Sequence, residues 1–158
     1  MKKYIALFLA LVLVFSLAAC GKKSPYFEVE IGDAIKIGEF DWRVLDIQDG
    51  KALVISDQVL MNKPYNATRG DLTWETCEIR QYLNGDFYDV TFTEEEKEWV
   101  IETTVKNENP TPDFKTDSGN DTVDRLFLLS VQEAEQYFAD NAARKAANLA
   151  TGKGTSDW

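Results

Sequence analysis

Cys77 is the side chain that most readily suggests chemistry in this sequence, because a cysteine thiolate is a strong nucleophile. It lies in the segment TWETCEIRQYLN, between the acidic residues Glu75 and Glu78. A catalytic thiol needs a base or a cation beside it to lower its pKa, whereas neighbouring carboxylates raise that pKa. We therefore predict that Cys77 is a small buried packing residue and that the chain has no catalytic residue.

The 158-residue chain contains no histidine. A Ser-His-Asp triad, a Cys-His pair and a histidine-ligated zinc site therefore cannot be built from this chain alone. Carboxylate pairs and lysine chemistry remain available, but with 27 acidic residues some carboxylate pair is expected by composition alone. We expect a non-catalytic protein, with a carboxylate-dependent enzyme as the alternative.

Three side chains around Cys77 could contact a ligand, namely Trp74, Arg80 and Asn84. An aromatic ring next to amide and guanidinium donors suits a polar ligand such as a carbohydrate. The same residues also have a structural explanation, because a tryptophan on an apolar helical stripe usually belongs to the core. An asparagine before a glycine often ends a helix. We favour the structural role and name these three residues as the candidates for any ligand site.

The polar segment 107–124 contains four aspartates, Asp113, Asp117, Asp121 and Asp124. Calcium prefers clustered oxygen ligands of this kind. Their spacing, however, matches no compact calcium-binding loop such as the EF-hand. We therefore expect a solvated acidic loop without a metal or a cofactor, with calcium in the 107–124 loop as the alternative.

The elements that must position these residues begin with a β-hairpin over residues 35–60. Apolar and polar side chains alternate on both sides of Asp49 and Gly50. An Asp-Gly pair between two alternating runs is a strong hairpin signal, because glycine adopts positive φ without strain. Residues 125–130 predict a further short, buried strand.

Three segments predict helices. The first would end just before Gly85, since glycine commonly follows the last helical residue. The second and third each open with a capping-box pair, Thr93 with Glu96 and Ser130 with Glu133. Together with the strands, these helices indicate an α+β fold. The predicted helices cover residues 74–84, 92–105 and 130–150.

The N-terminus has the pattern of a leader. Lys2 and Lys3 precede an apolar run, residues 5–19, that is shorter than the roughly 20 residues of a typical membrane span. A positive start, an apolar core and small residues at its end are typical of a signal peptide. The end, Leu-Ala-Ala-Cys, resembles the lipobox of bacterial lipoproteins, which implies cleavage before Cys20 and a lipid on its thiol. An ordinary secretory signal or an uncleaved helix is the alternative.

The predicted domain organisation is a signal peptide (1–19), a lipid-anchored tether (20–34) and one α+β domain (35–158). Without the two leader lysines, 15 basic side chains face 27 acidic ones, a net charge of −12. Such a surface repels nucleic acid. The expected partners are therefore the membrane, through the N-terminal lipid, and an unknown extracytoplasmic ligand.

The order of the motifs FDWRVLDIQDGKALVISDQVL, TWETCEIRQYLNGDFYDVTFTEEEKEWV and DTVDRLFLLSVQEAEQYF resembles a family of bacterial secreted proteins and lipoproteins, domain of unknown function 6273. The resemblance runs from about Gly38 to Trp158. It implies a layout similar to C-type-lectin-like domains of the formylglycine-generating-enzyme kind. Cys77 stands where that family usually has a small hydroxyl residue. The family pattern usually continues beyond Trp158, which implies that C-terminal strands are missing.

These observations lead to one expected function and two alternatives. We expect a lipid-anchored, non-catalytic domain on the outer face of the cytoplasmic membrane of a Gram-positive bacterium, binding envelope glycan, peptide or protein. The first alternative is a carboxylate-dependent enzyme acting on envelope polymers. The second is a truncated family member without a function of its own.

Overall fold

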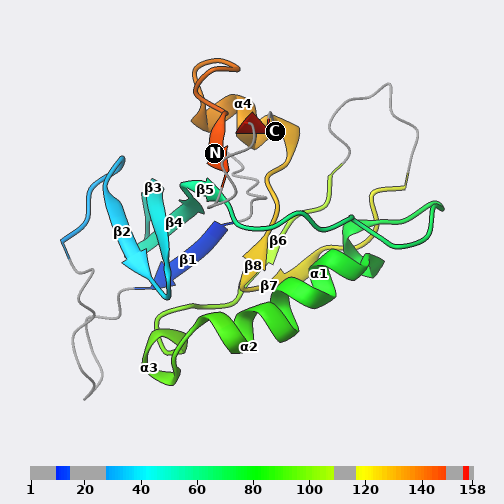
Figure 1. The fold of residues 1–158 in the computed structure, drawn as a ribbon, viewed down its shortest axis with the longest axis horizontal. Helices are drawn as coiled ribbons and strands as arrows, with labels where there is room; N and C mark the ends of the chain where they lie inside the picture. Colours follow the sequence, from blue (N-terminus) through cyan, green and yellow to red (C-terminus); the bar gives the residue numbers. More distant parts are fainter. Residues whose placement is uncertain (1–9, 15–27, 109–116, 149–154, 157–158) are drawn as a thin grey trace.

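The computed structural model describes residues 10–14, 28–108, 117–148 and 155–156, and in these residues the protein has an α+β fold (Figure 1). Cys20 and Asp113 lie outside the described residues. The main sheet is antiparallel and has the strand order β2-β3-β4-β1-β8. Its strands are β2 (Ala34–Ile37), β3 (Phe40–Gln48), β4 (Lys51–Ser56), β1 (Ala10–Val14) and β8 (Leu126–Phe127).

The predicted hairpin is confirmed as β3 and β4. Asp49 and Gly50 form its two-residue turn with φ of 51° and 70°, as a tight turn of the type favoured between twisted strands requires. A β-bulge lies between Val44 and Asp46, where the register shifts by one residue. Trp42 is fully buried on this hairpin, and its indole Nε1–H donates to the carbonyl of Ile37 over 3.0 Å.

β1 comes from the segment predicted to be the leader. All five of its residues pair with β4, from Ala10 opposite Ile55 to Val14 opposite Lys51. On its other side, Ala10 and Leu11 pair with the two residues of β8. Figure 1 shows this strand in dark blue inside the sheet.

The first predicted helix is present, and Gly85 interrupts it where its end was predicted. The chain passes through a 3-10 turn (η1, Trp74–Thr76), α1 (Glu78–Tyr82), a π-helical turn (η2, Leu83–Phe87) and α2 (Tyr88–Thr91). Gly85 has a non-helical backbone, with φ −117° and ψ −107°, and a second helical segment that was not predicted follows this kink. The run continues because Phe87 and Tyr88 extend the buried face beyond the glycine.

The second predicted helix is much shorter than residues 92–105. The capping box of Thr93 and Glu96 is confirmed, but α3 covers only Glu94–Lys97. The β-branched residues that follow favour a strand, and β6 (Thr103–Val105) pairs with β7 (Thr122–Asp124) in a separate antiparallel sheet.

The third predicted helix also begins at its capping box, Ser130 with Glu133, and ends early. This helix, α4, covers Val131–Tyr137. Beyond it, the side chain of Asp140 accepts the backbone N–H of Ala143, a local turn that competes with helix. A small third sheet follows, in which β9 (Ala146–Asn148) pairs with β5 (Gln58–Val59) and β10 (Thr155–Ser156).

The hydrophobic core lies between the main sheet and the run of helices. Figure 1 shows α1 and α2 along one side of the molecule beside β7 and β8, with α4 on the opposite side. Residues 52–56 of β4 are all buried, so side chains on both faces of this strand are covered. In the described part of the chain, no helix is long and apolar enough to span a bilayer.

Candidate functional site

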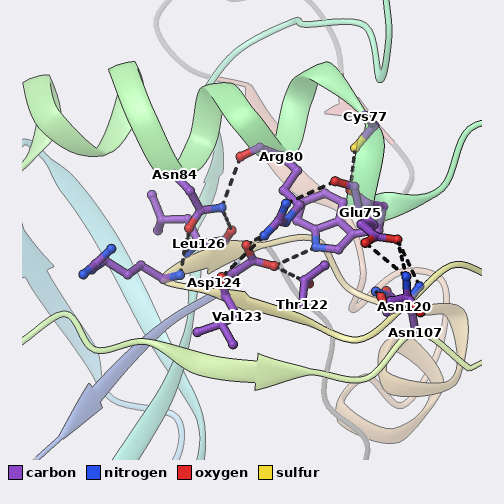
Figure 2. A network of polar contacts seen from close by, with 12 residues as sticks. Glu75, Cys77, Arg80, Asn84, Asn107, Asn120, Thr122, Val123, Asp124 and Leu126 are labelled. Atoms are coloured by element: carbon purple, nitrogen blue, oxygen red, sulfur yellow. Dashed lines mark hydrogen bonds and ion pairs between the residues drawn. The ribbon is translucent and has the colours of Figure 1, made fainter.

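Two of the three predicted ligand residues, Trp74 and Arg80, meet at Asp124, at the end of β7. Asn84 instead contacts the backbone that follows Asp124, and Figure 2 shows Arg80, Asn84 and Asp124 from close by. The indole Nε1–H of Trp74 donates to Asp124 Oδ2 over 2.9 Å. The guanidinium Nε–H of Arg80 donates to Asp124 Oδ1 over 2.8 Å, and the Asp124 side chain has no exposed area. The hydroxyl of Thr122 completes this set with a 2.6 Å hydrogen bond to Oδ2. Each carboxylate oxygen of Asp124 therefore has at least one donor inside the protein.

Asn84 is engaged in the same way with the backbone of the next strand. Its amide nitrogen donates to the carbonyl of Leu126 over 2.8 Å. Its amide oxygen accepts the backbone N–H groups of Arg125 and Leu126, at 2.8 and 3.1 Å. Both ends of the Asn84 amide thus hydrogen-bond to backbone groups at β8, as the backbone of a neighbouring strand would.

These contacts join the helical run to β7 and β8 with the groups that a ligand would need. The remaining guanidinium nitrogens of Arg80 donate to the backbone carbonyls of Glu75 and Val123. The arrangement supports the structural role for Trp74, Arg80 and Asn84, while their role in ligand binding stays a prediction. Sequence reasoning missed Asp124 as the shared partner of Trp74 and Arg80. The sequence signal that could have indicated Asp124 was the strand-like alternation Thr122-Val123-Asp124. In the structure its two polar residues are buried and Val123 is exposed.

Cys77 is fully buried, in agreement with the predicted packing role. Its Sγ lies 3.2 Å from the carbonyl oxygen of Trp74, to which the thiol donates. The hydroxyl of Tyr65 lies beside it, and burial together with the contact to Cys77 raises the pKa of Tyr65 above its ordinary value.

The acidic loop is organised by contacts within the protein. The carboxylate of Asp121 pairs with Lys106 and accepts the backbone N–H of Asn107, and these contacts lower the pKa of Asp121. Asp117 accepts the N–H of Gly119 over 2.9 Å. Among the described residues, no three acidic or thiol side chains converge as a metal site would require. Calcium in the 107–124 loop stays untested, because Asp113 is not among those residues.

A groove of about 630 Å³ lies on another side of the helical run, between the β2–β3 turn and α2. Four aromatic residues line it, Phe40, Tyr82, Phe87 and Phe92. The rings of Phe40 and Phe87 stack with centroids 6.1 Å apart, and Tyr82 lies 6.0 Å from Phe87. Val90 stands at this groove with 81% of its surface exposed, the largest exposed fraction among the large hydrophobic side chains described.

Carboxylates and a close backbone contact define the rim of this groove. Glu39 is exposed, whereas Glu96 accepts the N–H of Gly38 over 2.7 Å and closes the Thr93 capping box. Burial alone would raise the pKa of Glu96, but the hydrogen bonds from Thr93 and Gly38 hold it below its ordinary value. Gly38 has φ of 62°, and a Cβ there would lie 2.7 Å from the carbonyl oxygen of Thr91. Glycine is thus required where the turn approaches α2.

Sequence reasoning missed this groove. Its lining comes from the β2–β3 turn and the start of β3 on one side, and from α1, η2, α2 and α3 on the other. Phe40 and Tyr82, which face each other across these two parts of the chain, are 42 residues apart in the sequence. The one local signal was the concentration of aromatic residues from Tyr82 to Phe92.

The fold and these contacts define a small α+β domain, and the sequence places it in a family. Residues 49–157 match domain of unknown function 6273 (DUF6273), so the chain belongs to that family. The match covers the hairpin turn, the helical run and β6 to β10. No curated protein and no solved structure matches the chain significantly.

Proposed function

We propose that this protein is a lipid-anchored, non-catalytic binding domain that holds a neutral glycan chain of the bacterial envelope in the groove between the β2–β3 turn and α2. The observation that carries the proposal is the groove itself, in which flat apolar rings lie next to carboxylates. Binding sites for small molecules typically combine an apolar lining with a few polar groups that fix orientation. Sugars present both an apolar ring face and hydroxyl groups, so their chemistry matches this lining.

The net charge favours a neutral polymer over an anionic one. The chain carries 27 acidic against 17 basic residues, and Glu39 stands exposed at the groove. The negative potential of such a surface lowers the local concentration of anionic ligands, raises that of cationic ones and leaves that of neutral ones unchanged. A phosphate-rich envelope polymer is therefore a poor candidate, and an uncharged glycan or a basic peptide segment is a better one.

The groove is tested by titrating soluble envelope glycan fragments against Val90→Arg. The new arginine would fill the groove from an exposed position, so we expect affinity to fall by about tenfold or more, which corresponds to about 1.4 kcal/mol. Val123→Arg is the matched control, since Val123 is 57% exposed and does not line the groove. Equal affinity of both variants and the parent protein would rule out the groove as the binding site.

The membrane anchor rests on the lipobox at Cys20 and on the leader that precedes it. In bacterial cells fed labelled palmitate, we expect label in the wild-type protein and none in Cys20→Ala. We also expect the wild type in the membrane fraction. Label that persists in Cys20→Ala would contradict anchoring through this residue.

The alternative of a carboxylate-dependent enzyme is supported by one observation, the presence of Glu39 and Glu96 at the same groove. A general acid needs a raised pKa, whereas hydrogen bonds lower that of Glu96. Release of reducing ends from the same glycan fragments, lost in Glu39→Gln, would favour the enzyme over the binding domain.

A further inference from the structure

The position of β1 in the main sheet has a consequence for the processed protein. Five consecutive residues of the leader, Ala10–Val14, form an inner strand with β4 on one side and β8 on the other. If the leader is removed before Cys20, as the proposed function requires, the strand leaves the sheet with it. The backbone groups of β4 and β8 that face β1 then lose their hydrogen-bond partners.

We infer that the space between β4 and β8 is a strand-acceptor site, which in the processed protein takes an extended apolar segment of another polypeptide. Unpaired strand edges readily recruit a further strand from another chain, and the backbone hydrogen bonds supply much of the affinity. The occupant seen here defines the chemistry, because its sequence, Ala-Leu-Val-Leu-Val, has no charged or polar side chain.

The register defines the geometry of the guest strand. It must run antiparallel to β4 over five residues, and antiparallel to β8 over the two residues at its start. An apolar guest is favoured because its neighbour β4 is buried from Ala52 to Ser56. A charged residue in the middle of the guest would lie beside this core without a partner.

Direct closure of the gap is opposed by the way β8 is held. To pair with β4, β8 would have to move by about 4.8 Å, one strand spacing. On the side away from β1, the backbone N–H and C=O of Leu126 are bound by the side chain of Asn84. Moving β8 would break these hydrogen bonds or displace the helical run that carries Asn84.

The test uses the full chain with Cys20→Ala, which keeps the leader without acylation, and follows amide hydrogen exchange in β4 and β8. Leu11 lies opposite both Val54 and Leu126, so Leu11→Pro removes an N–H from the part of the strand that has neighbours on both sides and disfavours pairing. Ser16→Pro, outside β1, is the control. A peptide of residues 9–15 with lysines at both ends is then added, alongside the same peptide with Leu11→Pro.

We expect Leu11→Pro to speed exchange in β4 and β8 by about tenfold or more, with Ser16→Pro unchanged. We further expect the added peptide to restore slow exchange in the Leu11→Pro chain, and the proline-containing peptide to have no effect. Unchanged exchange in Leu11→Pro would overturn the inference, and so would fast exchange that the peptide does not slow.

The inference rests on the proposed removal of the leader, and the two are tested separately. The mass of the chain extracted from cell membranes reports whether residues 1–19 are present. A retained leader would contradict the proposed anchoring. The peptide experiment tests the acceptor site independently, whether or not the extracted chain retains residues 1–19.

Discussion

At the scale of single residues, Asp124 is the side chain on which the helical run and β7 depend. It is the common acceptor for Trp74, Arg80 and Thr122, and it is almost completely buried. A buried carboxylate with matched donors holds its surroundings in one arrangement, but it becomes strongly unfavourable when a donor is removed. Substitution of the donors should therefore affect stability before it affects binding.

Replacement of Arg80 by methionine tests this dependence. The change leaves Asp124 buried without its cation, so we expect the free energy of unfolding to fall by about 3 kcal/mol, measured by urea denaturation. Arg43→Met is the matched control, because Arg43 and Asp57 form an ion pair with both side chains 40% exposed. Exposed pairs contribute at most about 1 kcal/mol. Similar losses in the two variants would contradict the special role of Asp124.

Glu133 makes the stability of α4 depend on pH. It is 1% exposed, and burial raises its pKa to about 7 despite the hydrogen bonds from Ser130. The unfolded chain ionises near the ordinary value of 4.5, so the folded state loses stability as pH rises from about 4.5 to 7. At about 1.4 kcal/mol per pKa unit, the loss is on the order of 3 kcal/mol at most.

Glu133→Gln should remove this loss, because glutamine can also close a capping box. We expect the variant to gain stability relative to the wild type between pH 4.5 and 8, measured by urea denaturation at both values. Glu135→Gln, an exposed position on the same helix, should show no such gain. A parallel pH dependence of Glu133→Gln and wild type would refute the assignment.

At the scale of elements, local signals predicted where elements begin better than where they end. The Asp49-Gly50 turn and both capping boxes were confirmed, because each depends on residues within four positions of one another. Gly85 interrupts the first helix as predicted, but the second and third helices end earlier than predicted, at Lys97 and Tyr137. The hydrogen bond between Trp74 and Asp124 joins residues that are 50 positions apart, so no local sequence pattern predicted it.

The candidate site, too, was predicted from the sequence only in part. Trp74, Arg80 and Asn84 were named as ligand candidates because an aromatic ring next to guanidinium and amide donors suits a polar ligand. Their shared attachment to β7 and β8 required the fold. The groove could not be predicted, because its aromatic residues meet only after the β2–β3 turn packs on the end of α2, where Gly38 lies close to Thr91, and on α3, where the Gly38 N–H donates to Glu96.

Gly119 tests how closely the acidic loop must approach the helical run. It has φ of 79°, and a Cβ there would lie 2.7 Å from the Cβ of Thr73. Gly119→Ala should therefore lower the free energy of unfolding by at least about 1 kcal/mol. Gly70→Ala, where no atom lies within 4 Å of the added Cβ, should change it by less than about 0.5 kcal/mol. Thermal melts compare the stabilities of the two variants. Equal melting temperatures would contradict the close approach of Gly119 to Thr73.

At the scale of the whole molecule, the proposed glycan-binding groove and the proposed strand-acceptor site lie at different places on the main sheet. The β2–β3 end of the sheet forms one wall of the groove, whereas the gap between β4 and β8 lies at the opposite end of the strand order. Glycan binding and strand acceptance would therefore use separate surfaces. Among the residues that the structure describes, 22 buried apolar side chains form the core that supports both, and a cooperative thermal transition would argue against a truncated, non-functional chain.

The most direct test of the groove is a map of amide chemical shifts in the isotopically labelled protein as neutral glycan fragments are added. We predict changes at Gly38, Glu39 and Val90, which line the groove, and their loss in Val90→Arg. Changes confined to Trp74, Arg80 and Asn84 would instead place the ligand at the residues first named from the sequence. Either that result or the absence of any change would contradict the proposed binding function of the groove.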